Sequence, residues 1–215
     1  MGLGSLILGE SGFSVRISDT ADTFSFSHTN RSIEVSSRLV NKLRMNELEQ
    51  RYVFGHEMSH FVQLLQAPDA YIGTFEIARE EGKRAPENLK NEVQQAWNKY
   101  FNAFMDIHAN AINERRVPAF QTNNNPRPKL YEKVITPDLR SEPLNAQFCL
   151  AVLKHVMDPS HPPDVDESVH LVLERPFTRL GQRYASLYDY ATKELFSGDV
   201  SFSQMLYRLS SVVQP

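Results

Sequence analysis

Residues 53–61 read VFGHEMSHF, and the interpretation of the whole chain begins with this stretch. It contains the pattern HExxH, in which Glu57 directly follows His56 and precedes His60. On a helix, residues at positions i and i+4 lie on one face, so both imidazoles can reach the same metal ion. Glu57 lies about 100° further round the helix axis. It can therefore act on a water at the metal without binding the metal itself.

The segment around this pattern is predicted to be a helix that begins at Asn46 and ends near Gln66. Asn46 is a favourable N-cap, and Glu49 completes a capping box. Pro68 cannot continue the helix. One apolar stripe along it consists of Phe54, Met58, Phe61, Val62 and Leu65. The two histidines lie on another face, so the helix can bury one side and present them elsewhere. HExxH also arises by chance, so two structural histidines on an amphipathic helix are the alternative.

A catalytic zinc site needs a third protein ligand and one open position. A predicted helix carries one polar side that consists of Asn102, Asp106, Asn110 and Asn113. A face turned to water favours Lys, Glu and Gln, which are better helix formers than Asn and Asp. We therefore expect Asp106 to bind the metal and Asn110, one turn later, to orient a ligating histidine. The alternative is a polar face turned to water.

Other third ligands are possible from the sequence alone. Glu114 lies two turns after Asp106 on nearly the same face, and Glu76 and Glu80 follow soon after the HExxH helix. His108 falls in the middle of the apolar face of the Asp106 helix. It is therefore expected to be a buried core histidine with its hydrogen bonds satisfied.

The predicted fold class is α+β. The N-terminal part should form a small antiparallel sheet from residues 13–17, 23–27 and 33–35, which alternate apolar and polar side chains. After the helix that carries HExxH, the predicted helices span residues 74–81, 86–117, 143–157, 177–196 and 201–213, and residues 121–128 form a loop. We expect a core over residues 1–120 and a helical extension over 121–215 packed on the same domain.

Composition excludes several classes of function. The chain of 215 residues has a formal net charge of −3, so neither a nucleic-acid partner nor an anionic membrane surface is indicated. The single cysteine, Cys149, cannot form an internal disulfide and is expected to be buried. The N-terminus lacks the pattern of a signal peptide, and no apolar run is long enough to span a bilayer. These features predict a cytoplasmic protein.

Two segments resemble known peptidase families. Residues 33–61, from the predicted strand through "EL" to HExxH, resemble the strand-to-helix unit of small gluzincin-type zinc metallopeptidases. Residues 106–110, DIHAN, are similar to the E-x-x-A-N/D helix of ImmA/IrrE-type peptidases and to a helix of related uncharacterised bacterial metallopeptidases. The chain departs from the gluzincin pattern at Asp106, where those enzymes usually carry Glu. Aspartate is a competent zinc ligand, but its shorter side chain requires a closer approach of the two helices.

The resemblance implies a zincin-like core and a zinc-dependent peptidase acting on a protein or peptide. His56, His60 and Asp106 would hold Zn²⁺, and Glu57 would act as the general base towards a metal-activated water. The substrate would pair with an edge strand of the sheet, for which residues 33–36 are expected.

Hydrolysis also requires a group that stabilises the oxyanion. Candidates for stabilising the oxyanion, by residue type alone, are His161, His170, Tyr184 and Tyr188. Two other readings stay open, namely a zinc-binding protein without hydrolytic activity and a metal-free helical module for protein interaction. The sequence does not indicate an oligomeric state.

Overall fold

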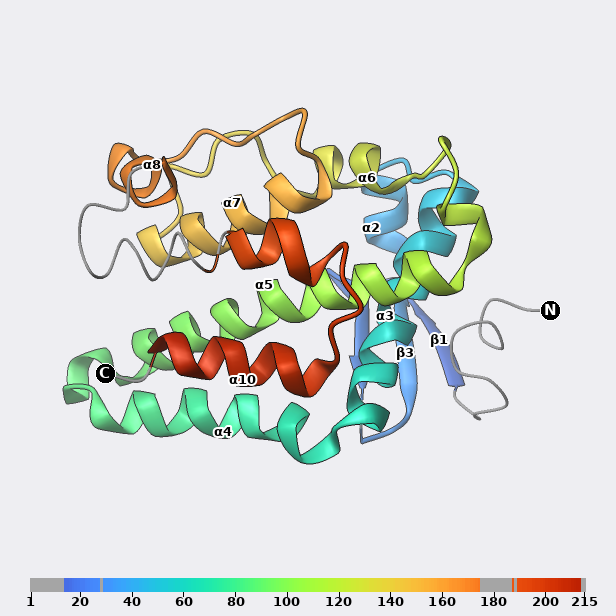
Figure 1. The fold of residues 1–215 in the computed structure, drawn as a ribbon. Coiled ribbons are helices and arrows are strands. Elements are labelled where there is room, and N and C mark those ends of the chain that lie inside the picture. Colours follow the sequence, from blue (N-terminus) through green and yellow to red (C-terminus); the bar gives the residue numbers. More distant parts are fainter. Residues whose placement is uncertain (1–13, 28, 175–186, 188, 214–215) are drawn as a thin grey trace. The chain divides into compact units, whose positions relative to one another are not determined.

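In the computed structural model, the described residues are 14–27, 29–174, 187 and 189–213 (Figure 1). The contacts divide the chain into two units, of which the first comprises Met1–Gln66 and Ala109–Val134 and the second Ala67–His108 and Ile135–Pro215. These two units are defined by contacts and differ from the predicted core over residues 1–120 and extension over residues 121–215. That predicted division is not tested by them and stays a prediction. Among the described residues, no helix is both long and apolar enough to cross a membrane.

The first unit contains a three-stranded sheet with the order β1-β3-β2. Its strands are β1 (Ser14–Ser18), β2 (Ser25–Ser27) and β3 (Ser32–Ser36). β2 is antiparallel to β3, but β1 is parallel to β3, so the prediction of a purely antiparallel sheet is wrong. The chain reverses twice between β1 and β3, which makes these two strands run in the same direction. β1 and β3 are neighbours in the sheet, so these two strands form a parallel pair.

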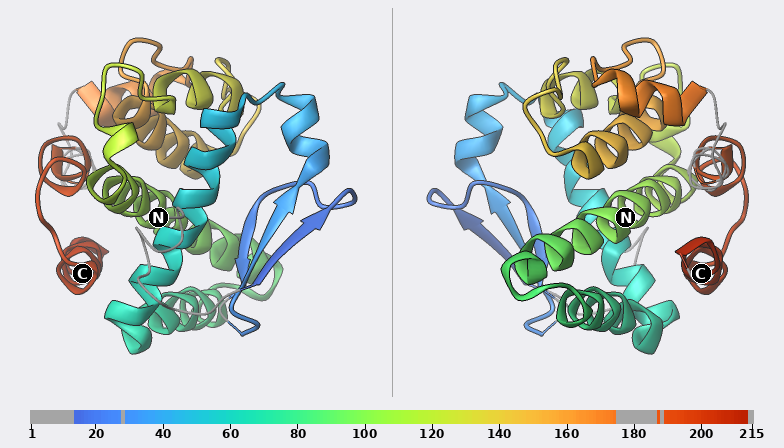
Figure 2. Two further views of the ribbon diagram at one scale, coloured as in Figure 1. Left: turned by 90° about the vertical axis from the view of Figure 1, so that its right-hand side faces the viewer. Right: turned by 90° about the vertical axis from the view of Figure 1, so that its left-hand side faces the viewer.

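The central position of β3 corrects a second expectation. Residues 33–36 were expected to form an edge that a substrate could extend, but both sides of β3 are already paired. The edges of the described sheet are β1 and β2. α2 (Ser37–Lys42), which the sequence did not predict, directly follows β3 (Figure 2). It is capped by Ser36, whose Oγ accepts from Leu39 N at 3.0 Å.

α3 (Glu47–Gln66) carries HExxH and begins where predicted. Asn46 N donates to Glu49 Oε2 at 2.8 Å and Glu49 N donates to Asn46 Oδ1 at 2.9 Å, which confirms the capping box. On the sheet side of α3, the ring of Phe61 lies 5.3 Å from that of Phe26 on β2. Leu65, at the end of the predicted apolar stripe, is 52% exposed and so lies outside the core.

The last part of α5 (Lys90–Arg116) lies close to α3 within the first unit. Asn113 Nδ2 donates to the carbonyl of Tyr52 at 2.9 Å. A Cβ atom on Gly55 would stand only 2.2 Å from Asn113 Oδ1, so this position on α3 requires a glycine. Two short helices complete the unit, η2 (Pro118–Phe120) and α6 (Arg127–Val134). The predicted loop 121–128 therefore ends slightly earlier than expected, in a helix that the sequence did not predict.

The second unit is helical in its described part (Figure 1). Its elements are α4 (Pro68–Arg84), η1 (Glu87–Leu89), the first part of α5, α7 (Leu144–Met157), α8 (Glu167–Glu174), the π-helical turn η3 (Tyr190–Leu195) and α10 (Phe202–Val213). The predicted helices at 143–157 and 201–213 are confirmed. The helix predicted at 74–81 is longer, because Pro68 occupies its first turn, where proline is favourable. Most of the helix predicted over 177–196 lies outside the described residues.

Two buried side chains of the second unit behave as expected. His108 is 1% exposed, its Nε2 lies 2.8 Å from the carbonyl oxygen of Val200, and its ring lies 5.8 Å from Phe202. It is a core histidine. Cys149 is 4% exposed, and burial raises its pKa to about 12. Its thiol therefore stays protonated and is a poor nucleophile and metal ligand.

Candidate metal centre

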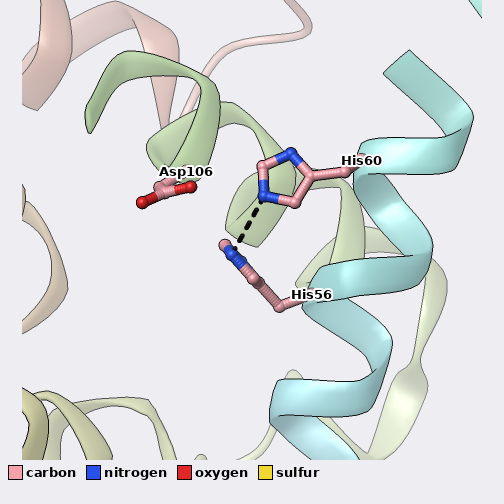
Figure 3. Close-up of side chains that lie close together, drawn as sticks. All are labelled: His56, His60 and Asp106. Carbon is pink, nitrogen blue, oxygen red and sulfur yellow. Dashed lines mark hydrogen bonds between the residues drawn. The ribbon is translucent and has the colours of Figure 1, made fainter. Parts of the chain in front are cut away.

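Three side chains that the sequence singled out lie together. One ligand atom from each of His56, His60 and Asp106 lies within 4.8 Å of the other two, and this is the one such group that the described residues contain (Figure 3). The histidines come from α3 and the aspartate from α5. Asp106 and Asn110, which contacts His56, lie one turn apart on the same continuous helix.

The two imidazoles are arranged as a pair of metal ligands would be. Nε2 of His56 lies 3.1 Å from Nε2 of His60, and the ring planes are at 85° to each other. In a tetrahedral zinc site with bonds of about 2.0–2.1 Å, two ligand nitrogens are about 3.3 Å apart. The observed separation therefore needs only a small adjustment to admit zinc.

The other ring nitrogen of His56 is held by Asn110. His56 Nδ1 lies 3.1 Å from Asn110 Oδ1, and Asn110 Nδ2 donates to the hydroxyl oxygen of Tyr131 at 2.7 Å. Asn110 and Asn113 are both fully buried, whereas Asn102 is exposed. The expectation that this polar stripe is hydrogen-bonded rather than solvated is thus confirmed for Asn110 and Asn113, and it is wrong for Asn102.

Gln63 holds the corresponding nitrogen of His60, and the sequence reasoning missed it. His60 Nδ1 lies 2.9 Å from Gln63 Oε1, and the glutamine is fully buried. Gln63 lies three residues after His60 on the same helix, which is the spacing at which helical side chains meet. That spacing was the available signal. Tyr131 was missed as well, because its contact spans 21 residues of sequence.

These contacts set the tautomer of both rings. With the amides oriented as in the structure, each Nδ1 faces a carbonyl-type oxygen, which only accepts hydrogen bonds. Each Nδ1 must therefore carry the proton, and each Nε2 presents a lone pair. With both Nδ1 atoms protonated, the lone pairs of the two Nε2 atoms, 3.1 Å apart, need a cation between them, which is either one shared proton on a cationic pair of rings or a metal ion. The donor set therefore fits a divalent metal ion.

Glu57 directly follows His56 on α3 and is buried, with 8% of its surface exposed. Glu114, the alternative third ligand, accepts from the hydroxyl of Tyr52 at 2.8 Å and lies 3.3 Å from Arg127. Burial first, and then the charge of Glu114, raise the pKa of Tyr52 well above its ordinary value. The phenol therefore stays a hydrogen-bond donor to Glu114.

The other candidates from the sequence are not part of the group. Glu76 is exposed, and Glu80 is exposed and accepts from Lys83 at 2.8 Å. His161 is exposed and lies 3.1 Å from Asp158, and His170 is exposed too. The two tyrosines proposed for the oxyanion, Tyr184 and Tyr188, lie outside the described residues.

Among the described residues, two imidazoles and one carboxylate come together, and a set of three protein ligands with an open fourth position is typical of a catalytic rather than a structural zinc. The same donor set also binds Fe²⁺. Comparison with known proteins gives no relative, because no protein-family model, no curated protein and no solved structure matches the chain.

Proposed function

We propose that the protein is a zinc-dependent peptidase with a zincin-like core, formed by the sheet and α3. His56, His60 and Asp106 hold the metal in this proposal, and Glu57 is the general base. The single observation that supports it most is the pair of Nε2 atoms 3.1 Å apart beside the Asp106 carboxylate.

The chemistry is divided between the metal and the chain. When bound, zinc lowers the pKa of water towards about 7 and polarises the carbonyl of a peptide bond. Glu57 takes the proton of the attacking water and passes it to the leaving amine. Its position next to His56 on α3 supports this role, because the carboxylate projects from a neighbouring face of the same helix.

The substrate is a peptide or protein segment in an extended conformation. Such segments bind to the open edge of a sheet through main-chain hydrogen bonds. In the described sheet β1 and β2 are the edges, and the first four residues of β1 are exposed. We therefore propose an edge of this sheet, and no longer residues 33–36, as the surface along which the substrate lies.

Two competing functions are less well supported. A structural zinc site is closed by four protein ligands, whereas three potential ligands come together among the described residues. A metal-free interaction module gives no reason for two buried amides to turn two histidine lone pairs towards each other.

Metal analysis and cleavage assays test the proposal together. Purified protein should contain one zinc ion per chain after exposure to a panel of Zn²⁺, Fe²⁺ and Mn²⁺, and it should cleave members of a peptide library. Glu57→Gln should keep the metal and lose turnover, while Glu76→Gln, at an exposed glutamate of α4, should behave as the wild type. Full activity of Glu57→Gln would exclude Glu57 as the base, and a metal-containing but inactive wild type would favour the non-hydrolytic reading.

A further inference from the structure

The Nδ1 atoms of His56 and His60 each contact the oxygen of a buried side-chain amide, and the two amides come from different helices. Gln63 on α3 contacts His60, and Asn110 on α5 contacts His56. We propose that Gln63, and Tyr131 acting through Asn110, are positioning residues that fix both imidazoles in the Nδ1–H tautomer before any metal binds. The proposal deepens the proposed metal site and rests on it for its purpose, but the tautomers themselves are a property of the metal-free protein.

Gln63 acts directly on His60. Its Oε1 lies 2.9 Å from His60 Nδ1, and its side chain is fully buried. A neutral imidazole in water exchanges its proton between the two nitrogens. An acceptor fixed on Nδ1 selects the form whose Nε2 is free to bind a metal.

Tyr131 acts on His56 through Asn110. An asparagine amide can present either its oxygen or its NH₂ group to a neighbour. The Tyr131 hydroxyl oxygen accepts from Asn110 Nδ2 at 2.7 Å, which leaves Oδ1 for His56 Nδ1. Without that acceptor the amide could turn over and present a donor to the ring, which would reverse the tautomer.

Two ion pairs hold α6, the helix that carries Tyr131, in place. Near its end, Lys133 Nζ donates to both oxygens of Glu49 at 2.6 and 2.8 Å, and the Glu49 side chain is 2% exposed. At its start, Arg127 lies 3.3 Å from Glu114. Tyr131 stands between these two ion pairs, so this eight-residue helix is fixed at both ends around the hydroxyl that faces Asn110.

Histidine ¹⁵N NMR of the metal-free protein measures the tautomers directly. We expect both His56 and His60 to show a protonated Nδ1 and an unprotonated Nε2. Gln63→Met, which removes the acceptor at similar size, should shift His60 towards the other tautomer, and Gln63→Glu, which keeps an oxygen there, should restore it. Tyr131→Phe should shift His56 in the same way.

Zinc titration against a chelating dye gives the second readout. Gln63→Met should weaken binding by roughly 10–100-fold, the usual effect of losing an outer partner of a ligating histidine. Matched controls are Gln66→Met, at an exposed glutamine of the same helix, and Tyr100→Phe, since Tyr100 and Tyr131 are both 8% exposed. Neither control should change the tautomers or the affinity.

The outcomes separate this inference from the proposed function. If the wild-type rings carry their protons on Nε2, the inference is overturned whether or not zinc binds, and this measurement needs no variant to fold. If the rings are protonated on Nδ1 but zinc does not bind, the inference is supported and the proposed function fails. Wild-type tautomers and zinc affinity in both Gln63→Met and Tyr131→Phe would overturn the positioning roles.

Discussion

Two regions of the molecule contain buried histidines, and the hydrogen-bond partner of the imidazole Nε2 atom differs between them. On α3, His60 is 8% exposed, and on α5, His108 is 1% exposed. Nε2 of His108 faces the carbonyl oxygen of Val200 at 2.8 Å, so it must donate a hydrogen bond. Nε2 of His60 instead faces Nε2 of His56, and its proton is held on the other side of the ring by Gln63.

Hydrogen bonding distinguishes a core histidine from a potential metal ligand. Burial does not separate them, because both rings are almost completely enclosed. The separating feature is the nitrogen that faces an acceptor: Nε2 in His108, and Nδ1 in His56 and His60. Only the latter arrangement leaves a pair of Nε2 lone pairs for a metal.

The largest expected effect comes from removing a ligand of the pair. His60→Ala should weaken zinc binding by more than the roughly 10–100-fold expected for its outer partner Gln63. Isothermal titration or dye competition measures it. If His60→Ala bound zinc as tightly as the wild type, the histidine pair would not be the metal site and the comparison with His108 would lose its meaning.

Asp106→Ala should have the next largest effect, because it removes the carboxylate of the group. Zinc affinity should fall, and the variant should fold normally, since Asp106 is only partly buried. Glu76→Ala, at an exposed carboxylate, is the control. Unchanged zinc affinity in Asp106→Ala would move the third ligand to Glu114 or another carboxylate.

His108→Leu should affect stability and leave zinc binding unchanged. The substitution removes the partner of the Val200 carbonyl, a loss that typically costs about 1–3 kcal/mol when a buried group is left unsatisfied. Urea denaturation measures the change in the free energy of unfolding. A large loss of zinc affinity at unchanged stability would show that His108, too, belongs to the metal site.

The smallest effect is expected for Gly73→Ala, with Gly55→Ala as its comparison. Gly55→Ala should cost about 1–3 kcal/mol, because the new methyl group would stand 2.2 Å from Asn113 Oδ1 and push α3 away from α5 behind the histidine pair. Gly73→Ala, on α4 with no atom within 4 Å of the new methyl group, should stabilise by about 0.5–1 kcal/mol. Equal changes in thermal unfolding temperature for the two variants would mean that the close approach at Gly55 is not required.

The sequence predicted those parts of the site that depend on short-range signals. The capping box at Asn46 and Glu49 and the proline at 68 define α3, and the spacing of His56 and His60 on it follows from helical geometry. The polar stripe on α5 pointed to Asp106 and Asn110 for a similar reason. Each of these signals is complete within one helix.

Features that depend on contacts between distant segments could not be predicted. Nothing in the sequence of β1 shows that it pairs in parallel with β3 and leaves β2 on the far side. Gln63 looks like an ordinary surface glutamine until its burial is known, and Tyr131 acts from a short helix without a strong local pattern. The contacts that support the histidines were therefore visible only in the structure.

An anomalous-scattering map at the zinc absorption edge, from crystals grown or soaked with Zn²⁺, would locate the metal directly. We expect one strong peak per chain within about 2.0–2.1 Å of Nε2 of His56 and of His60, with the Asp106 carboxylate as the third ligand. A peak at other residues, or none beside two imidazoles that have turned away from each other, would contradict it.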